Sequence, residues 1–139
     1  AANSGAQIGL PELDLGAVPA WGGSARLTKC VGENHAIDMI LRAKKISGER
    51  ALDIGLVHEI WPLANLKKAA HELAQELASM PAVAVRSMLG VLVNSADRPL
   101  SELLEAEREA VHANRGTSDS KEGMMAFLEK RKPVFNRSS

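Results

Sequence analysis

Apolar residues recur every three or four positions through the second half of the chain, with polar residues between them. This spacing gathers the apolar side chains on one face of an α-helix. It predicts helices over 65–80, 82–96 and 100–114, and a last helix that starts at Asp119. The second stretch is apolar nearly all round, which predicts a helix buried on several sides. Together these helices carry more apolar surface than they can hide from one another, which is typical of an oligomer interface.

The first half of the chain has shorter apolar runs, broken by glycine and proline. These runs predict strands over 6–10 and 56–60, an extended piece at 44–46, and helices over 24–31, 34–42 and 49–54. Ser47, Asn65 and Asp119 precede helical patterns and are expected to cap them. The pattern changes near Pro62, which divides the chain into a mixed module, 1–62, and a helical region, 63–139.

One stretch, residues 9–23, follows neither the helical nor the strand period. Its two prolines and four glycines exclude a continuous helix or a central strand, yet it is apolar. We therefore expect a loop that packs beneath other elements. Its one glutamate, Glu12, would lie in partly dry surroundings, which raise the pKa of a carboxyl group and suit a general acid or base.

Both acidic residues of this stretch also have a simpler interpretation. Composition alone favours Glu12 as a solvated turn residue, because perturbed carboxylates are a minority. Asp14 would share a face with Glu12 only in an extended segment, where the two could form a carboxylate pair. A solvent-facing or turn-capping aspartate is the expected role of Asp14.

Composition excludes several classes of function. The apolar fraction is 45%, the charged fraction is 24% and the formal net charge is zero, so nothing indicates nucleic acid or an anionic membrane as a partner. No apolar run approaches the roughly 20 residues that span a bilayer. The single cysteine, Cys30, is expected to be buried, and a reducing compartment is favoured over secretion. The four histidines lack ligand spacing, so no metal is expected.

The same irregular stretch resembles the signature of the crotonase superfamily, the enoyl-CoA hydratases and isomerases. The resemblance rests on three blocks of residues. The first consists of Gly9–Glu12, Leu15–Gly16, Pro19, Gly22–Gly23 and Arg26–Leu27, and the second of Ala36, Leu41, Ile46–Ser47, Ala51 and Gly55–Val57. The third consists of Glu122–Gly123, Ala126–Phe127 and Glu129–Arg131. They occur in order and cover nearly all of the chain. The resemblance implies the α/β crotonase-like ββα superhelix. This chain would be its mostly helical C-terminal portion with a few short strands, and it would lack the N-terminal half.

The resemblance also implies a chemistry. Glu12 matches a glutamate that handles a proton next to or beyond a thioester carbonyl, and an acyl pocket is implied at Pro11, Gly16, Pro19, Trp21 and Gly22. Trp21 stands where a small residue is common, so it would narrow or floor the pocket; the alternative is simple packing in the core. The oxyanion hole and a second glutamate would lie in the missing half, so this chain alone is expected to be a poor catalyst or none.

The implied reaction is hydration of a 2-enoyl-CoA to a 3-hydroxyacyl-CoA, with isomerisation, thioester hydrolysis or decarboxylation as alternatives. The CoA thioester is the substrate, and no cofactor is expected. Phe127 and Lys130, three positions apart and therefore on one helix face, would reach the CoA site of a neighbouring subunit in a trimer or dimer of trimers. The alternative is a core phenylalanine and a solvated lysine.

Two further expectations concern the setting of the protein. The expected location is the cytoplasm, with the mitochondrial matrix as the alternative. A function of a different class also stays open, which is a helical assembly module without activity. Such a module would fold by association with itself or with the missing half.

Overall fold

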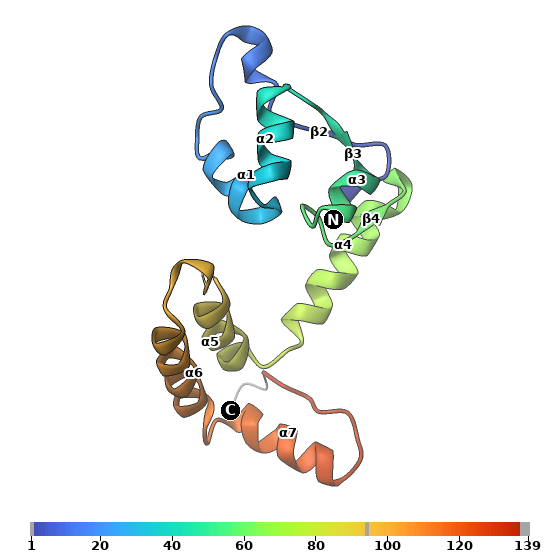
Figure 1. Cartoon of the computed structure of the whole chain (residues 1–139). Helices are drawn as coiled ribbons and strands as arrows, with labels where there is room; N and C mark the ends of the chain where they lie inside the picture. The colour runs from blue at the N-terminus through green and yellow to red at the C-terminus, as the bar shows by residue number, and fades with distance from the viewer. Residues whose placement is uncertain (1, 94, 137–139) are drawn as a thin grey trace. The chain divides into compact units, whose positions relative to one another are not determined.

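The computed structural model describes residues 2–93 and 95–136 and divides into two compact units, residues 1–72 and 73–139. As predicted, the chain is mostly helical with a few short strands (Figure 1). The first unit contains β1 (Ala2–Asn3), β2 (Gln7–Ile8), the 3₁₀ turn η1 (Glu12–Leu15), α1 (Gly23–Val31), α2 (Glu33–Leu41), β3 (Ile46–Ser47), α3 (Gly48–Asp53) and β4 (Ile60–Trp61). Helix α4 (Leu63–Ala78) crosses the boundary. The second unit contains α5 (Ala82–Leu92), the 3₁₀ turn η2 (Ser95–Asp97), α6 (Leu100–Asn114) and α7 (Ser118–Leu128). The predicted division at Pro62 lies at the start of α4, whereas the compact units divide within that helix.

The strands pair across long stretches of sequence within the first unit. Strand β1 runs parallel to β4 with Ala2 opposite Ile60, and β2 runs antiparallel to β3 with Ile8 opposite Ile46. The predicted strand over 6–10 is therefore present but short. The prediction of a strand over 56–60 was wrong for most of its length, because the backbone N–H groups of Leu56 and Val57 both donate to the carbonyl of Ala51. These residues close α3 instead of extending a sheet.

Helices α1 and α2 supply most of the core of the first unit. Leu27 and Val31 lie one turn apart on α1, and Ala36 and Met39 face them from α2. Spacings of three and four positions place each pair on one helix face. Ile46 and Ala51 complete the buried cluster, so the core joins both helices to β3 and α3.

An ion cluster fixes the connection from α2 to β3. The carboxylate of Asp38 accepts hydrogen bonds from Lys44 at 3.1 Å and from Arg42 at 2.8 Å. Hydrogen bonds first from Lys44 and then from Arg42 lower the pKa of Asp38, because both stabilise its charged form. Residues 44–46 are thereby tied to the helix that precedes them.

Of the three predicted helix caps, one was right. The Ser47 hydroxyl accepts a hydrogen bond from the Arg50 N–H and caps α3, as predicted. Asn65 lies inside α4, which begins directly after Pro62. A proline suits the start of a helix because the first amides have no helical partner there. At α7 the cap is Thr117, which accepts from the Ser120 N–H, and Asp119 is the second residue of the helix.

The prediction that 82–96 forms a helix buried on several sides was also wrong. Helix α5 ends at Leu92, and none of its described residues is buried; residue 94 lies outside the described residues. The helix packs against α6, where Ala110 is buried. The predicted excess of apolar surface is present, with large exposed side chains on all three long helices of the second unit: Met88, Leu89 and Leu92 on α5, Leu100, Leu104 and Val111 on α6, and Met124, Met125, Phe127 and Leu128 on α7.

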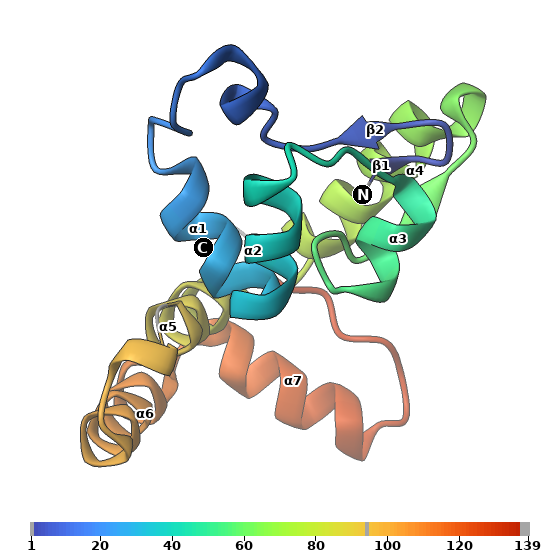
Figure 2. The ribbon, with the colours of Figure 1, turned by 45° about the horizontal axis from the view of Figure 1, so that its top comes forward.

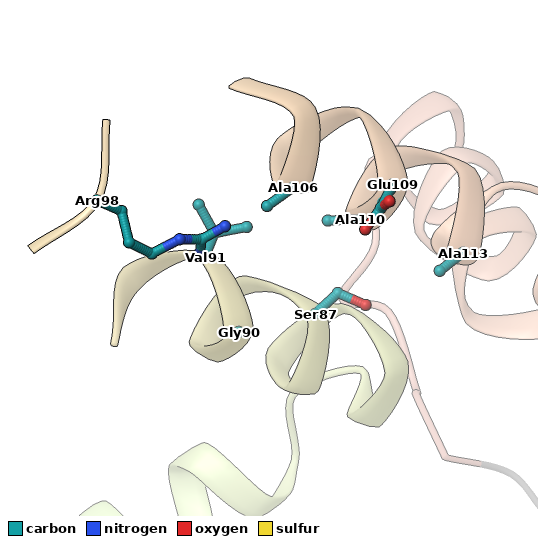
Figure 3. A pocket seen from close by; sticks show the side chains of 8 residues that line it. All are labelled: Ser87, Gly90, Val91, Arg98, Ala106, Glu109, Ala110 and Ala113. Atoms are coloured by element: carbon teal, nitrogen blue, oxygen red, sulfur yellow. The ribbon is translucent and has the colours of Figure 1, made fainter. Parts of the chain in front are cut away.

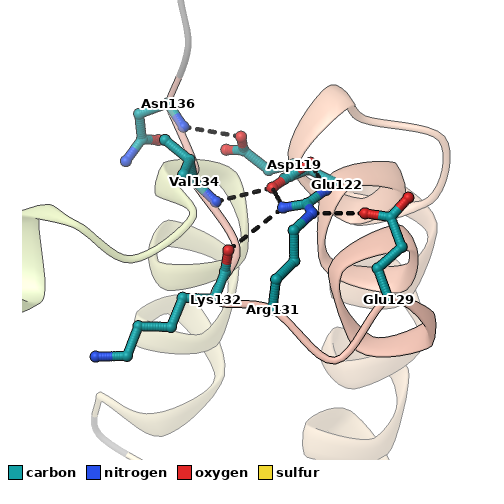
Figure 4. Close-up of polar contacts among 7 residues, drawn as sticks. All are labelled: Asp119, Glu122, Glu129, Arg131, Lys132, Val134 and Asn136. Atoms are coloured by element: carbon teal, nitrogen blue, oxygen red, sulfur yellow. Dashed lines mark hydrogen bonds and ion pairs between the residues drawn. The ribbon is translucent and has the colours of Figure 1, made fainter.

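The C-terminal segment 131–136 folds back along α7 (Figure 4). Arg131 binds both carboxylate oxygens of Glu122, at 2.5 and 3.0 Å, and also binds Glu129 at 2.6 Å. These two carboxylates raise the pKa of Arg131, Glu122 more than Glu129. The Val134 N–H donates to Glu122 at 2.9 Å, so one carboxylate holds two points of the segment.

Asn136 at the end of this segment caps two helices at once. Its side-chain amide donates to the carbonyls of Met80, at 2.8 Å, and Ala78, at 3.3 Å, where α4 ends. Its side-chain oxygen accepts from the N–H of Ala82 at 3.0 Å, where α5 begins. Helix ends leave such groups without helical partners, and Pro81 has no side-chain group that could serve them. Asn136 therefore joins the α4–α5 connection to the segment bound along α7.

We expect Asn136→Ala to destabilise the second unit by about 1 kcal/mol, because three backbone groups lose a partner but can still bind water. The measurement is the free energy of unfolding by chemical denaturation, together with amide exchange at Ala82. Lys132→Ala is the control, since this exposed side chain lies in the same segment and its loss should change stability by less than about 0.5 kcal/mol. Equal stability of the two variants would contradict the capping role.

Candidate functional site

The candidate site is the loop that joins β2 to α1. Figure 2 shows the chain leaving β2, forming the short turn η1 and returning to α1. The base of the loop is closed where Leu10 and Pro19 meet Gly23. A β-carbon at Gly23 would lie 3.4 Å from the Leu10 side chain and 3.9 Å from that of Pro19. These are ordinary van der Waals distances, so the two ends of the loop lie close together at Gly23.

Glu12 is the first residue of η1, and this turn lies against α2. The turn is tight: the N–H groups of Asp14, Gly16 and Ala17 donate to the carbonyls of Pro11, Leu13 and Glu12. Pro11 precedes the turn, and Gly16 ends it with φ of 66°, a left-handed conformation that glycine adopts without a steric penalty. Two of the predicted pocket residues, Pro11 and Gly16, therefore set the shape of the turn that carries Glu12.

The Glu12 side chain is half-buried, and its Oε2 atom is shielded from solvent without a hydrogen-bond partner among the described residues. A buried polar atom that lacks a partner is unusual in a folded protein and calls for an explanation. The prediction of partly dry surroundings for Glu12 is confirmed by this burial. Within the described part of the chain, the Oε2 atom therefore has an unused acceptor position.

Asp14 does not form a pair with Glu12. The segment is a 3₁₀ turn with about three residues per turn, so positions two apart point in different directions. Asp14 is exposed, as expected for a solvent-facing aspartate. The carboxylate pair would have required an extended segment, and the chain does not adopt one here.

The prediction that this loop packs beneath other elements was wrong for the part beyond Glu12. Leu15, Val18 and Trp21 are 82, 76 and 95% exposed. The described residues place no element over them, so their apolar surface faces outward. The interpretation of Trp21 as a core residue is likewise wrong for this structure.

Trp21 lies in a strained turn. The N–H of Gly23 donates to the carbonyl of Ala20 at 3.0 Å, and the two residues between them have φ of 59° at Trp21 and 80° at Gly22. Positive φ at both central residues is the pattern of a type I′ turn, which favours glycine and asparagine. Left-handed backbone costs roughly 1–2 kcal/mol for a residue with a side chain. Trp21 adopts this conformation because neighbouring contacts hold it there.

Several hollows lie in the described structure, and two of them differ in how they relate to the loop. The first, of about 220 Å³, is apolar and adjoins the base of the loop, and its lining includes Leu10, Gly23 and Arg26 but not Glu12. The second, of about 360 Å³, lies between α5 and α6, and Figure 3 shows its eight lining residues: Ser87, Gly90, Val91, Arg98, Ala106, Glu109, Ala110 and Ala113. None of the predicted site residues lines the second hollow.

The structure changes the interpretation of Phe127, Lys130 and Cys30. Phe127 is 79% exposed near the end of α7, so it is not a core residue. Lys130 follows the helix, with φ of 54°, so the argument that the two share a helix face was wrong. They stay adjacent through the Lys130 N–H, which donates to the Phe127 carbonyl at 3.2 Å. Cys30 is exposed, contrary to the expected burial.

Within residues 2–93 and 95–136, no group of three or more histidine, cysteine, aspartate or glutamate side chains is placed to hold a metal ion. Among the described helices, none combines the length and apolar character that crossing a membrane requires.

The sequence pattern of the enoyl-CoA hydratase/isomerase family matches residues 1–138. The chain belongs to this family. It is 37% identical over 131 residues to the mitochondrial enoyl-CoA hydratase of Pongo abelii, and the aligned residues are 94% of this chain and 45% of that protein. It is 36% identical over 131 residues to the short-chain-enoyl-CoA hydratase of Clostridium acetobutylicum, with 94% of this chain and 50% of that protein aligned.

The fold agrees with that family. The crystal structure of the enoyl-CoA hydratase from Bacillus anthracis superposes with a TM-score of 0.90 at 33% identity, covering 96% of this chain and 52% of that one. The predicted crotonase fold is therefore confirmed. The chain spans about half the length of the relatives it matches.

For this member of the enoyl-CoA hydratase/isomerase family, sequence reasoning found Glu12 and the loop around it but gave no role to Arg26. The Arg26 guanidinium donates to the Trp21 carbonyl at 2.9 Å. Two sequence signals pointed to it: Arg26 is among the residues that carry the family resemblance, and it follows Gly22 by four positions, close enough to reach back over the start of α1.

Proposed function

We propose that this chain is the part of an acyl-CoA enzyme that supplies the acid/base glutamate, Glu12, and the loop that contacts the acyl chain. The proposed reaction is hydration of a 2-enoyl-CoA to a 3-hydroxyacyl-CoA. Membership of the enoyl-CoA hydratase/isomerase family supports an enzyme of this class. The observation that carries the proposal is the solvent-shielded Oε2 atom of Glu12, which has no hydrogen-bond partner among the described residues.

In the proposed reaction, one O–H bond of water breaks as its oxygen bonds to C3 of the enoyl group, the C2–C3 π bond is lost, and a proton bonds to C2, so that the elements of one water molecule are added. Electron density passes through the thioester oxygen as an enolate, so a proton has to be given or taken at carbon while that charge is stabilised. We assign the proton transfer to the Glu12 carboxyl group. Shielding from water lets such a group exchange a proton with the substrate instead of with solvent. The donors that stabilise the enolate oxygen are assigned to the part of the relatives that this chain does not span.

The loop residues beyond Glu12 are proposed to contact the acyl chain. Leu15, Val18 and Trp21 offer apolar surface on the same loop as the carboxylate, and the turn formed at Pro11 and Gly16 sets their direction. Pro19 and Gly22 complete the proposed acyl-binding set, because they shape the second half of the loop. The apolar area that an acyl chain would cover there favours binding by about 25 cal/mol for each Å² removed from water.

Phe127 and Lys130 are proposed to contact the CoA moiety of a neighbouring subunit. Support comes from the exposure of both side chains, Phe127 in the last turn of α7 and Lys130 just beyond its end, where they can reach another molecule. The assembly would be a trimer or a dimer of trimers, closed through the exposed apolar faces of α5, α6 and α7. The cytoplasm is the proposed location, with the mitochondrial matrix as the alternative.

The test uses a hybrid enzyme in which the upstream half of the Bacillus anthracis hydratase is fused ahead of residue 1 of this chain. We expect the hybrid to consume crotonyl-CoA and form the 3-hydroxy product, measured by loss of the enoyl absorbance and by mass spectrometry. The hybrid could instead fold and bind acetoacetyl-CoA but convert only 3-enoyl-CoA or another thioester. That result would contradict hydration and favour one of the other family reactions, which are isomerisation, thioester hydrolysis and decarboxylation.

A non-catalytic assembly module is the second candidate, because the helices of the second unit expose so many apolar side chains. This candidate predicts self-association of the 139-residue chain and no response of its thermal unfolding to CoA thioesters. A ligand that binds only the folded state raises its stability by mass action. A rise in the unfolding temperature with acetoacetyl-CoA would therefore count against the module and for the enzyme.

A further inference from the structure

Arg26 lies at the start of α1 and reaches back over the strained turn. Its Nη1 atom donates to the Trp21 carbonyl at 2.9 Å, and its own backbone N–H donates to the Gly22 carbonyl at 3.0 Å. A β-carbon at Gly22 would lie 3.1 Å from the Arg26 Cζ and Nη1 atoms, so the guanidinium lies directly over this glycine. Arg26 thus binds both central residues of the Ala20–Gly23 turn.

These contacts explain how the turn keeps a conformation that tryptophan disfavours. A carbonyl that accepts a hydrogen bond from a cation is held more firmly than one that accepts from a neutral donor. The bond fixes the orientation of the Trp21–Gly22 peptide, and the absence of a side chain at Gly22 leaves room for the guanidinium plane. The indole projects from this turn and is 95% exposed. Without Arg26, Trp21 would relax toward negative φ and its indole would point elsewhere.

We propose that Arg26 is a positioning residue for acyl recognition, which holds the Ala20–Gly23 turn so that Trp21 meets the acyl chain. This inference rests on the proposed function, because the contact between Trp21 and an acyl chain is part of that proposal. Arg26 itself does not contact the substrate. It determines which acyl chains are accepted because it sets the direction of the indole at the loop end, while the proton transfer stays with Glu12.

The first test uses the 139-residue chain and NMR amide exchange. The Gly23 N–H closes the turn, so its exchange reports whether the turn is formed. We expect Arg26→Gln to speed this exchange about tenfold or more, because the charge-assisted bond to Trp21 is lost. Arg26→Lys should restore most of the protection, since a lysine can still donate to the carbonyl. Arg42→Gln, at an exposed arginine bound to Asp38 on α2, is the control and should leave Gly23 unchanged.

The second test compares acyl chains in the hybrid enzyme. Arg26→Gln should raise the KM for long-chain 2-enoyl-CoA thioesters about tenfold, while kcat with crotonyl-CoA stays within about twofold of wild type. An equal loss of kcat for every chain length, or unchanged Gly23 exchange in the first test, would overturn the proposal. If the unmodified hybrid converts no thioester, the proposed function fails, and Gly23 exchange alone still decides whether Arg26 holds the turn.

Discussion

Replacing Glu12 with glutamine in the hybrid enzyme is expected to lower kcat for hydration by roughly 10²–10⁴-fold. Glutamine has nearly the same shape and can occupy the same place on η1, but it cannot give or take a proton at carbon. The cost should fall on kcat and leave KM nearly unchanged, because the acyl contacts come from other residues of the loop. Initial rates with crotonyl-CoA across a range of concentrations separate the two constants.

Asp14→Asn is the matched control for this prediction. It makes the same kind of change two residues away, on a side chain that is exposed and points in another direction on the 3₁₀ turn. We expect it to keep kcat within about threefold of wild type, as for a surface substitution away from the reacting atoms. If Glu12→Gln retains full turnover in a folded hybrid, or if Asp14→Asn loses as much, Glu12 has no part in the chemistry.

The sequence predicted the helices well where local signals decide them. Ser47 caps α3, as its residue type predicted, and Gly32 ends α1 with φ of 79°, a conformation that glycine adopts readily. Asn65 and Asp119 have equally suitable side chains but do not act as caps. Pro62 already starts α4, and Asp119 instead accepts the backbone N–H of Asn136, a residue 17 positions away. Local preference could not choose between Asp119 and Thr117, which caps α7 two residues earlier.

The candidate site was predictable in its residues but not in its geometry. The prolines and glycines located the loop, and an acidic residue among apolar ones made Glu12 a candidate. The period of the pattern could not show that Leu15, Val18 and Trp21 point outward, because burial depends on what covers the loop. Positive φ at Trp21 could not be predicted either, since tryptophan rarely adopts it and the Arg26 side chain that binds its carbonyl lies five residues further on.

Gly9→Ala should damage both the stability of the first unit and the site. A β-carbon at Gly9 would lie 2.7 Å from the Lys44 carbonyl oxygen and 3.1 Å from the Lys45 Cα atom. Those neighbours are backbone, so the strain cannot be relieved by a side-chain rotation. The clash falls next to the pairing of Ile8 with Ile46, a core residue, and we expect a loss of about 1–3 kcal/mol in the free energy of unfolding.

Hydration by the hybrid should fall along with stability, because Gly9 lies three residues before Glu12 and a shift of β2 away from residues 44–46 carries η1 with it. A misplacement of about 1 Å at a reacting group can lower the rate about 10²-fold.

The control is Gly90→Ala in α5, where a β-carbon would meet nothing within 4 Å and alanine favours the helix by up to about 1 kcal/mol. Chemical denaturation should therefore show a lower free energy of unfolding than wild type for Gly9→Ala and a higher one for Gly90→Ala. If Gly9→Ala keeps the wild-type unfolding free energy, the close approach of β2 to residues 44–45 does not exist in solution, and Glu12 is not held in place by it.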